Sequence, residues 1–123
     1  MSMTYQDCMA FLAKAKCASK GRPVAKATRM KLTLYTHQPP QAELSYHNTY
    51  IVNWTPNKTV FTNGGYMTQT TKSRLNDYLP SGYRIRQVKG EWVLTTPEHM
   101  PDKWLPNYFV LKFTPEGELM NWL

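Results

Sequence analysis

Polar and apolar residues alternate on both sides of a tight turn at Lys89-Gly90, and this alternation restricts the fold more than any other feature of the sequence. The stretch Tyr83–Thr95 reads YRIRQV-KG-EWVLT. With Lys89-Gly90 as the turn, Ile85 falls opposite Leu94, and successive side chains point to opposite faces. A period of two around a glycine-containing turn is typical of a hairpin with one buried side. The sequence therefore predicts an antiparallel sheet.

Further segments carry the same signals. Thr28–Tyr35 alternates and predicts a half-buried strand, and a second extended run leads through Leu44 to Trp54. The turn TPNK and the run TVFT after it complete a predicted hairpin, and YFVLKF-TPEG-ELMNWL predicts another at the end of the chain. We expect loops at THQPPQ (residues 36–41), because proline joins neither a helix nor a central strand, and at Pro97–Pro106.

Two segments predict helices. Residues 5–18 place apolar side chains on one face, and Thr4 before them supplies a side-chain oxygen for the free amides of a helix start. A second helix is expected to begin at a cap formed by Thr70 or Thr71 and to end before Pro80, after about two turns.

These elements indicate an α+β fold: one small domain with a strongly curved antiparallel sheet of five to seven strands, an N-terminal helix and a short second helix. A length of 123 residues suits one domain, and 41% apolar with 13% aromatic residues supply a core that disordered chains lack. We divide the chain into an N-terminal helix (1–20), an α+β core (21–96), and a loop with a C-terminal hairpin (97–123).

The formal net charge of +7 is concentrated in two blocks. Residues 1–31 contain seven Lys or Arg and the single acid Asp7, and residues 57–100 carry an excess of three positive charges. A basic surface favours nucleic acid, acidic protein surfaces or anionic membrane. Membrane is the weakest of these, because no apolar run approaches the ~20 residues that span a bilayer and the first residues do not resemble a signal peptide.

The residues predict neither a metal site nor a catalytic centre. The candidate ligands show no Cys-x-x-Cys or His-x-x-x-His pair; they are Cys8, Cys17, His37, His47 and His99. On one helix, the two cysteines would be about 13 Å apart, so we expect reduced thiols in a cytosolic protein, with Cys8 in the core. We expect His47, in a strand beside Asn48, to be buried and hydrogen-bonded. The carboxylates do not converge, which favours a protein without cofactor or enzymatic activity.

Four blocks in order resemble a group of small proteins encoded by tailed bacteriophages. They are RPVAKATR (22–29), HNTYIV (47–52), NGGYMTQTTKSRLN (63–76) and PSGYRIRQVKGEW (80–92). The likeness covers roughly residues 21–94, and the N-terminal helix and the tail after Thr95 lie outside it. The resemblance implies phage origin, action in the host bacterial cytoplasm, and a role in genome replication, host takeover or evasion of host defence. It provides no catalytic residues to carry over.

The second predicted helix is a candidate anion site. If Thr71 is the cap, Lys72 and Arg74 fall in the first turn, where cations oppose the helix dipole at a cost of about 0.3–1 kcal/mol each. Free amides, threonine hydroxyls and cations there would hold a phosphate, and strand arginines would extend the site along a backbone. The predicted anion-binding residues are Tyr66, Thr70, Thr71, Lys72, Arg74, Arg84 and Arg86.

The alternative is that these cations only mark solvent-exposed faces, since exposed helices and strands often carry Lys and Arg. Tyr83 and Trp92 are expected in the core, and the alternative for both is a stacking platform for bases. The N-terminal block forms a secondary basic patch that would add salt-dependent affinity for a polyanion without sequence specificity. The patch consists of Lys14, Lys16, Lys20, Arg22, Lys26, Arg29 and Lys31.

Three functional hypotheses follow. The first is a non-enzymatic protein that binds nucleic acid, or a nucleic-acid-bearing host complex, through its basic face. The second is an inhibitor of a host enzyme or defence complex that docks on an acidic surface through aromatic and arginine anchors, with Trp104, Tyr108 and Trp122 contributing. The third, an enzyme acting on nucleotides, has the least support. Pairing of sheet edges between two subunits is a further expectation.

Overall fold

The computed structural model describes residues 3–14, 20–97 and 101–122, with side chains as far as residue 120. The helices of this part are α1 (Tyr5–Leu12) and α2 (Gln69–Tyr78). The strands are β1 (Arg22–Ala25), β2 (Thr28–Tyr35), β3 (Gln38–Tyr46), β4 (Thr49–Trp54), β5 (Thr59–Thr62), β6 (Arg84–Val88), β7 (Glu91–Thr95), β8 (Lys103–Trp104), β9 (Val110–Phe113) and β10 (Leu119–Trp122).

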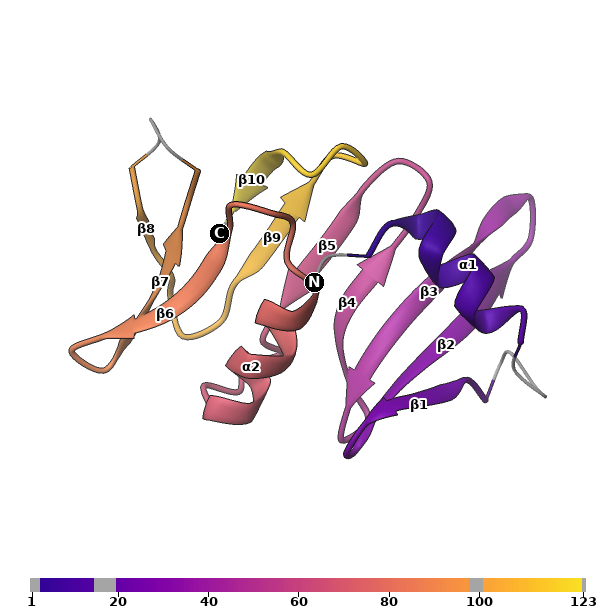
Figure 1. The fold of residues 1–123 in the computed structure, drawn as a ribbon, viewed down its shortest axis with the longest axis horizontal. Helices are drawn as coiled ribbons and strands as arrows, with labels where there is room; N and C mark the ends of the chain where they lie inside the picture. The colour runs from indigo at the N-terminus through magenta and orange to yellow at the C-terminus, as the bar shows by residue number, and fades with distance from the viewer. Residues whose placement is uncertain (1–2, 15–19, 98–100, 123) are drawn as a thin grey trace.

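The strands form two antiparallel sheets. Seven strands lie in the order β1-β2-β3-β4-β5-β9-β10, and β6-β7-β8 form a second sheet. Figure 1 shows α1 lying over the β2–β4 side of the large sheet and α2 between the large sheet and β6. The predicted α+β class is confirmed. The predicted single sheet corresponds to the seven-stranded one, and the hairpin around Lys89 belongs to the second sheet.

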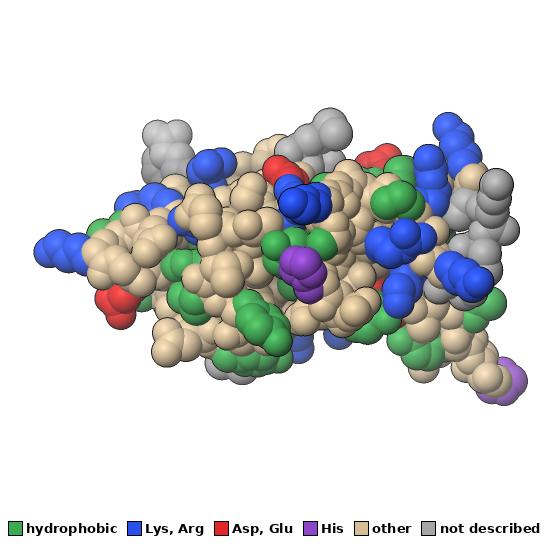
Figure 2. All heavy atoms as spheres, turned by 90° about the horizontal axis from the view of Figure 1, so that it is seen from below, with side chains coloured by type: hydrophobic (Ala, Val, Ile, Leu, Met, Phe, Trp, Pro, Cys, Tyr) green, Lys and Arg blue, Asp and Glu red, His purple; other side chains and the backbone are tan. Residues whose placement is uncertain are grey.

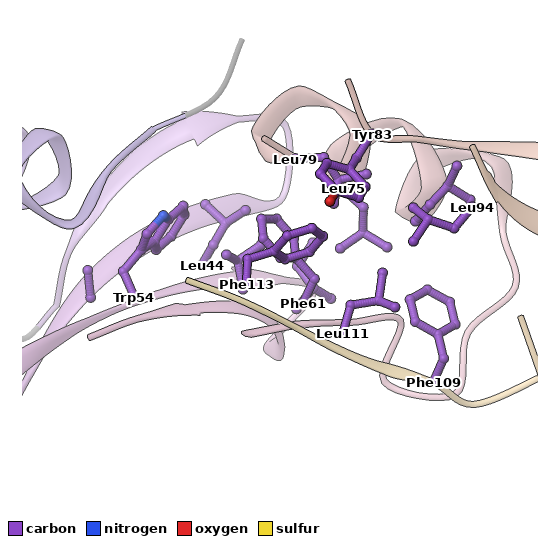
Figure 3. Close-up of a cluster of buried hydrophobic side chains, with 14 of the residues drawn as sticks. Leu44, Trp54, Phe61, Leu75, Leu79, Tyr83, Leu94, Phe109, Leu111 and Phe113 are labelled. Atoms are coloured by element: carbon purple, nitrogen blue, oxygen red, sulfur yellow. The ribbon is translucent and has the colours of Figure 1, made fainter. Parts of the chain in front are cut away.

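The inner face of the seven-stranded sheet carries the core. The strand register places one buried residue of each of five strands in a row; they are Met30, Leu44, Val52, Phe61 and Leu111. Figure 3 shows Leu75 of α2 and Leu94 of β7 pointing toward this face, so the helix and the small sheet cover it together. Arg29, Lys31 and Glu43, at neighbouring register positions, point to the outer face, against which neither described helix packs.

Tyr83 and Trp92 are buried, as predicted. The Tyr83 ring meets Phe113 edge to face with centroids 4.9 Å apart, and its hydroxyl accepts a hydrogen bond from the Leu119 amide at 3.1 Å. The predicted hairpin register is also confirmed, with Ile85 opposite Leu94. These contacts leave neither ring free to act as a stacking platform.

Helix α1 begins as predicted but ends earlier. Thr4 and Asp7 form a reciprocal capping box, and the helix stops at Leu12, with Ala13 as C-cap. The Phe11 carbonyl accepts a 2.8 Å hydrogen bond from the Arg22 guanidinium, which also stacks 4.0 Å from the Phe11 ring centroid. Residues 15–18 of the predicted helix lie outside the described part.

Two predicted loop segments contain strand residues, and one further strand was not predicted. Pro39 and Pro40 belong to β3, contrary to the prediction, because β4 starts to pair with β3 only at Ala42. The missing proline N–H groups therefore cost no hydrogen bond on that side. Residues 22–25, before the predicted strand at Thr28, form β1, and Lys103–Trp104 form the two-residue strand β8.

A side chain joins α2 to the small sheet. The side-chain oxygen of Asn76 accepts a 2.7 Å hydrogen bond from the backbone N–H of Ile85. The side-chain nitrogen of Asn76 donates a 2.8 Å hydrogen bond to the backbone carbonyl of Ile85. One asparagine thus supplies the donor and the acceptor that a strand residue would supply at the free edge of β6. This contact fixes how α2, and with it the site residues before it, sits in the fold.

Candidate functional site

Helix α2 begins two or three residues earlier than predicted. Thr68, not Thr70 or Thr71, is the N-cap, and its hydroxyl accepts the Thr71 amide at 3.2 Å. The Lys72 amide already bonds the Thr68 carbonyl at 3.1 Å. Lys72 and Arg74 therefore stand beyond the first turn, and the predicted conflict with the helix dipole does not arise.

Lys72 is almost completely buried, with an exposed fraction of 8%. Its ammonium donates to the side-chain oxygen of Gln87 at 3.4 Å, so the side chain crosses from α2 to β6. In this position the side chain is packed between α2 and β6, whereas an anion site at the helix start would need it to point into solvent.

Arg74 also turns toward the protein. Its Nε donates to the Thr28 hydroxyl at 3.1 Å, and a guanidinium nitrogen lies 3.9 Å from the Asp77 carboxylate. Thr28 is buried at the start of β2. Arg74 therefore links α2 to the edge of the large sheet.

The two strand arginines lie on another surface. Arg84 and Arg86 are exposed on the face of β6 opposite Ile85, as predicted. Arg86 forms a 2.7 Å ion pair with Asp102 and donates to the Thr95 hydroxyl at 2.9 Å. Arg84 and Arg86 thus share a face with each other but not with Lys72.

The remaining three predicted site residues come together. Tyr66, Thr70 and Thr71 line a hollow of about 410 Å³ between the start of α2 and the β3–β4 turn. We call it the threonine hollow; it is lined by Tyr46, His47, Thr49, Tyr66, Thr68, Thr70 and Thr71. Two of the lining residues, Thr68 and Thr71, form a 2.9 Å hydrogen bond between their hydroxyls at the start of the helix.

The Asn-Gly-Gly turn sets Tyr66 in place. The buried side chain of Asn63 accepts a 3.0 Å hydrogen bond from the backbone N–H of Gly65 and donates a 2.7 Å hydrogen bond to the backbone carbonyl of Asn107. Its own carbonyl accepts the Tyr66 amide at 3.0 Å. Gly64 has φ +62°, and a Cβ there would lie 2.5 Å from Thr49 Cγ2, so the turn requires glycine. The ring of Tyr66 is left 57% exposed at the rim of the hollow.

The secondary basic patch gathers at the β1–β2 end of the molecule. Figure 2 shows Lys and Arg side chains clustered over this end. Lys20, Lys26 and Arg29 are exposed, and Lys31 is partly exposed on the outer sheet face. We call these four residues the basic end. Lys14 is exposed after α1, Arg22 bonds Phe11, and Lys16 lies outside the described residues.

The basic end and the threonine hollow meet at His47. A second hollow, of about 310 Å³, is lined by Thr28, Arg29, Ser45, His47 and neighbouring residues of the β1–β2 and β3–β4 turns. His47 lines both hollows. His47 therefore joins the hollow that Arg29 lines to the hollow that Tyr66 lines.

The prediction for His47 was wrong. The residue is exposed and has φ +50°, because His47 and Asn48 (φ +66°) form the two-residue turn between β3 and β4. Its ring meets Tyr46 edge to face at 4.4 Å. Sequence reasoning also missed Tyr46, Thr49 and Thr68. Asn48, which tolerates positive φ, was the available signal for this turn.

Comparison with models of known protein families identifies the family of this chain. A family model for the Kyanoviridae Gp96 protein matches residues 3–113. The chain belongs to the Kyanoviridae Gp96 family. This is a family of phage proteins, which confirms the phage resemblance and extends it to α1 and β9. Comparison with curated proteins gave no significant match, and comparison with solved structures gave none either.

Metal ligands, the cysteine and the helices were compared with the predictions over the described part of this Gp96 family member. No group of three His, Cys, Asp or Glu residues there could hold a metal ion. Cys8 is fully buried, as predicted for a core residue, and burial together with the nearby Asp7 charge raises the pKa of its thiol. Among the described helices, none has the length and apolar character needed to cross a bilayer.

Proposed function

We propose that this phage protein binds nucleic acid, free or within a host complex, in the cytoplasm of the infected bacterium. The observation that carries the proposal is the lack of charge compensation at the basic end. Within the described residues, no carboxylate lies within 4.0 Å of an amine or guanidinium nitrogen of Lys20, Lys26, Arg29 or Lys31. Residues 20–42 contain no acid at all.

The acid of β3 forms no ion pair with the basic end within the described residues. Glu43 lies opposite Lys31 in the register, but its carboxylate accepts a hydrogen bond from the Thr33 hydroxyl. The Lys31 ammonium instead lies 3.3 Å from the Tyr50 hydroxyl and 5.4 Å from the centre of that ring. Lysines held without acidic partners attract phosphates and release counterions on binding.

The shape of this region also suits a nucleic acid. Arg29 is held by hydrogen bonds of 3.2 and 3.0 Å to the carbonyls of Lys20 and Gly21, so its guanidinium is fixed above β1. Tyr50 is exposed beside Lys31 on the open outer face of the sheet. Cations beside an exposed ring on an open sheet can contact both the backbone and the bases.

The test is binding of labelled single- and double-stranded DNA and RNA at low salt, followed over a salt series. We expect log K to fall linearly with log salt. The Lys20→Glu/Lys26→Glu variant should weaken binding and reduce the slope by about 2. The control is Arg84→Glu/Lys89→Glu, which makes the same charge change on the small sheet and should cost less affinity. No binding of any of these nucleic acids at low salt would exclude the proposal.

A protein partner is the second candidate, favoured by exposed aromatic residues outside the basic end. Trp104 is 53% exposed and Tyr108 58% exposed. Tryptophan, tyrosine and arginine are the common anchors of protein interfaces, and Arg84 and Arg86 lie on the same small sheet as Trp104. An acidic surface of a host enzyme or defence complex would complement these arginines. The Trp122 side chain lies outside the described part.

The inhibitor hypothesis predicts that a tagged copy retrieves one stoichiometric host protein after nuclease treatment. Trp104→Ala should abolish this retrieval, and Lys20→Glu/Lys26→Glu should not. Retrieval that disappears with nuclease would count against it. Pairing of sheet edges in a homodimer stays a prediction; β1 and β10 are the edges that the seven-stranded sheet offers.

A further inference from the structure

We propose that the threonine hollow receives one unstacked base of a single strand, so that the protein prefers single-stranded to double-stranded nucleic acid. This inference rests on the proposed function, because the basic end supplies the phosphate contacts that bring a strand to the hollow. It adds a second contribution to the binding affinity, which comes from contact with a base.

The lining of the hollow suits a base better than a phosphate. Lys72 and Arg74 do not line it, and His47 is its one member with an ionisable basic side chain. Two tyrosines and a histidine supply ring surfaces, and the exposed ring of Tyr66 stands at the rim. A base stacks on such rings whatever its identity, because every base has an aromatic face.

The hydroxyl groups of the lining are available to a ligand. Thr68 and Thr71 are occupied with each other and with the helix start. The hydroxyls of Thr49, Thr70 and Tyr66, in contrast, have no hydrogen-bond partner within the part of the chain that the structure describes. Hydroxyls both donate and accept, so they can meet the edge of any base.

The size of the hollow limits the occupant to about one nucleotide. Its volume of about 410 Å³ is at the lower end of the range for small-molecule sites, roughly 300–1,000 Å³. Bases inside a duplex are stacked and paired, and a protein reaches their faces only after paying for unstacking. A hollow of this kind therefore selects strands whose bases are already free.

The position of the hollow fits a strand that also touches the basic end. His47 belongs to both hollows, and Arg29 lines the one nearer to β1. A strand whose phosphates lie on Lys26 and Arg29 can pass His47 and place the next base against Tyr66. The turn at Asn63 holds the backbone of Tyr66 through a hydrogen bond, so this residue has its position before the strand arrives.

The experiment measures the affinity of three labelled probes for the protein and its variants. The probes are a mixed-sequence single strand, its duplex, and the same single strand with abasic sites. We expect the single strand to bind more tightly than the duplex and the abasic strand. Tyr66→Ala should weaken binding of the single strand about 5- to 100-fold, with little effect on the other two probes. Tyr66→Trp should restore it.

Tyr35→Ala is the matched control, because Tyr35 is an exposed tyrosine of β2 that lines neither hollow. It should leave all three affinities unchanged. If Tyr66→Ala weakens the three probes equally or not at all while Lys20→Glu/Lys26→Glu still reduces binding, the base site is wrong and nucleic-acid binding stands. If the unsubstituted protein binds none of the probes at low salt, both proposals fail.

Discussion

The guanidinium of Arg74 donates a 3.1 Å hydrogen bond to the buried hydroxyl of Thr28, forty-six positions earlier in the chain. The same hydroxyl donates to the Lys26 carbonyl at 2.8 Å. One threonine thus joins α2 to the β1–β2 turn, and the threonine hollow keeps its position relative to the basic end through this contact.

A double-mutant cycle tests the link. Arg74→Met and Thr28→Val should each lower the free energy of unfolding by about 1–2 kcal/mol, because each leaves a partner group without its hydrogen bond. The double variant should lose less than the two losses added together, by about 0.5–1.5 kcal/mol. Urea unfolding measures all four proteins. Strict additivity would show that the two side chains stabilise the fold independently.

Asn63 is predicted to be the most sensitive polar side chain of the site. It is fully buried and bonds the Gly65 amide and the Asn107 carbonyl, so Asn63→Ala leaves both groups short of a partner. We expect a loss of about 2–4 kcal/mol in the free energy of unfolding. Asn57→Ala, in an exposed turn, is the control and should change it little. Equal effects of the two substitutions would contradict this role.

Lys72→Met should raise the free energy of unfolding by about 1 kcal/mol. The side chain is almost completely buried and its ammonium gains one long hydrogen bond to Gln87, whereas methionine fills similar space without a charge to desolvate. Gln87 is exposed and can bond water instead. Affinity for nucleic acid should not change. A weakened affinity would show that Lys72 reaches the ligand after all.

Cys8 should be protected in the native protein. In a Cys17→Ser background, a thiol reagent should modify Cys8 only after unfolding, because the side chain is fully buried and its pKa is raised by that burial. Rapid labelling under native conditions, at the rate of a free thiol, would show that α1 opens readily.

The same pKa shift makes a prediction about alkaline stability. A raised pKa means that the fold favours the neutral thiol; this contribution is complete below the ordinary value of 9.0 and is lost as the pH rises above it. Burial, followed by the Asp77 charge, also raises the pKa of Tyr78. Cys8→Ala should therefore lose less stability than the unsubstituted protein between about pH 8 and about pH 10, with the Tyr78 contribution remaining. Parallel pH profiles would refute the thiol contribution.

Local alternation was sufficient to predict the hairpins, because period two and turn residues are set by neighbouring positions. The register of Ile85 with Leu94 follows from Lys89-Gly90 alone. The division into two sheets could not be read in this way. It depends on β5 pairing with β9, about fifty residues later, while β6 turns to meet α2 instead.

The candidate site was only partly predictable for the same reason. Thr70, Thr71 and Tyr66 were predicted from the helix start and do lie together. Lys72 was predicted to bind an anion at the helix start, or else to face solvent, but its burial depends on where β6 packs, which no local pattern records. The contribution of His47 depends on a turn between β3 and β4 that brings it beside α2.

The Asn76–Ile85 contact also affects how readily the protein associates with other chains. An exposed strand edge invites another chain to add to it, which is a common start of aggregation. At the Ile85 position of β6, both backbone groups are already satisfied by a side chain from the same molecule. Substituting Asn76 would therefore do more than loosen α2: it would open a docking strip for foreign strands, and the first visible sign would be a loss of solubility.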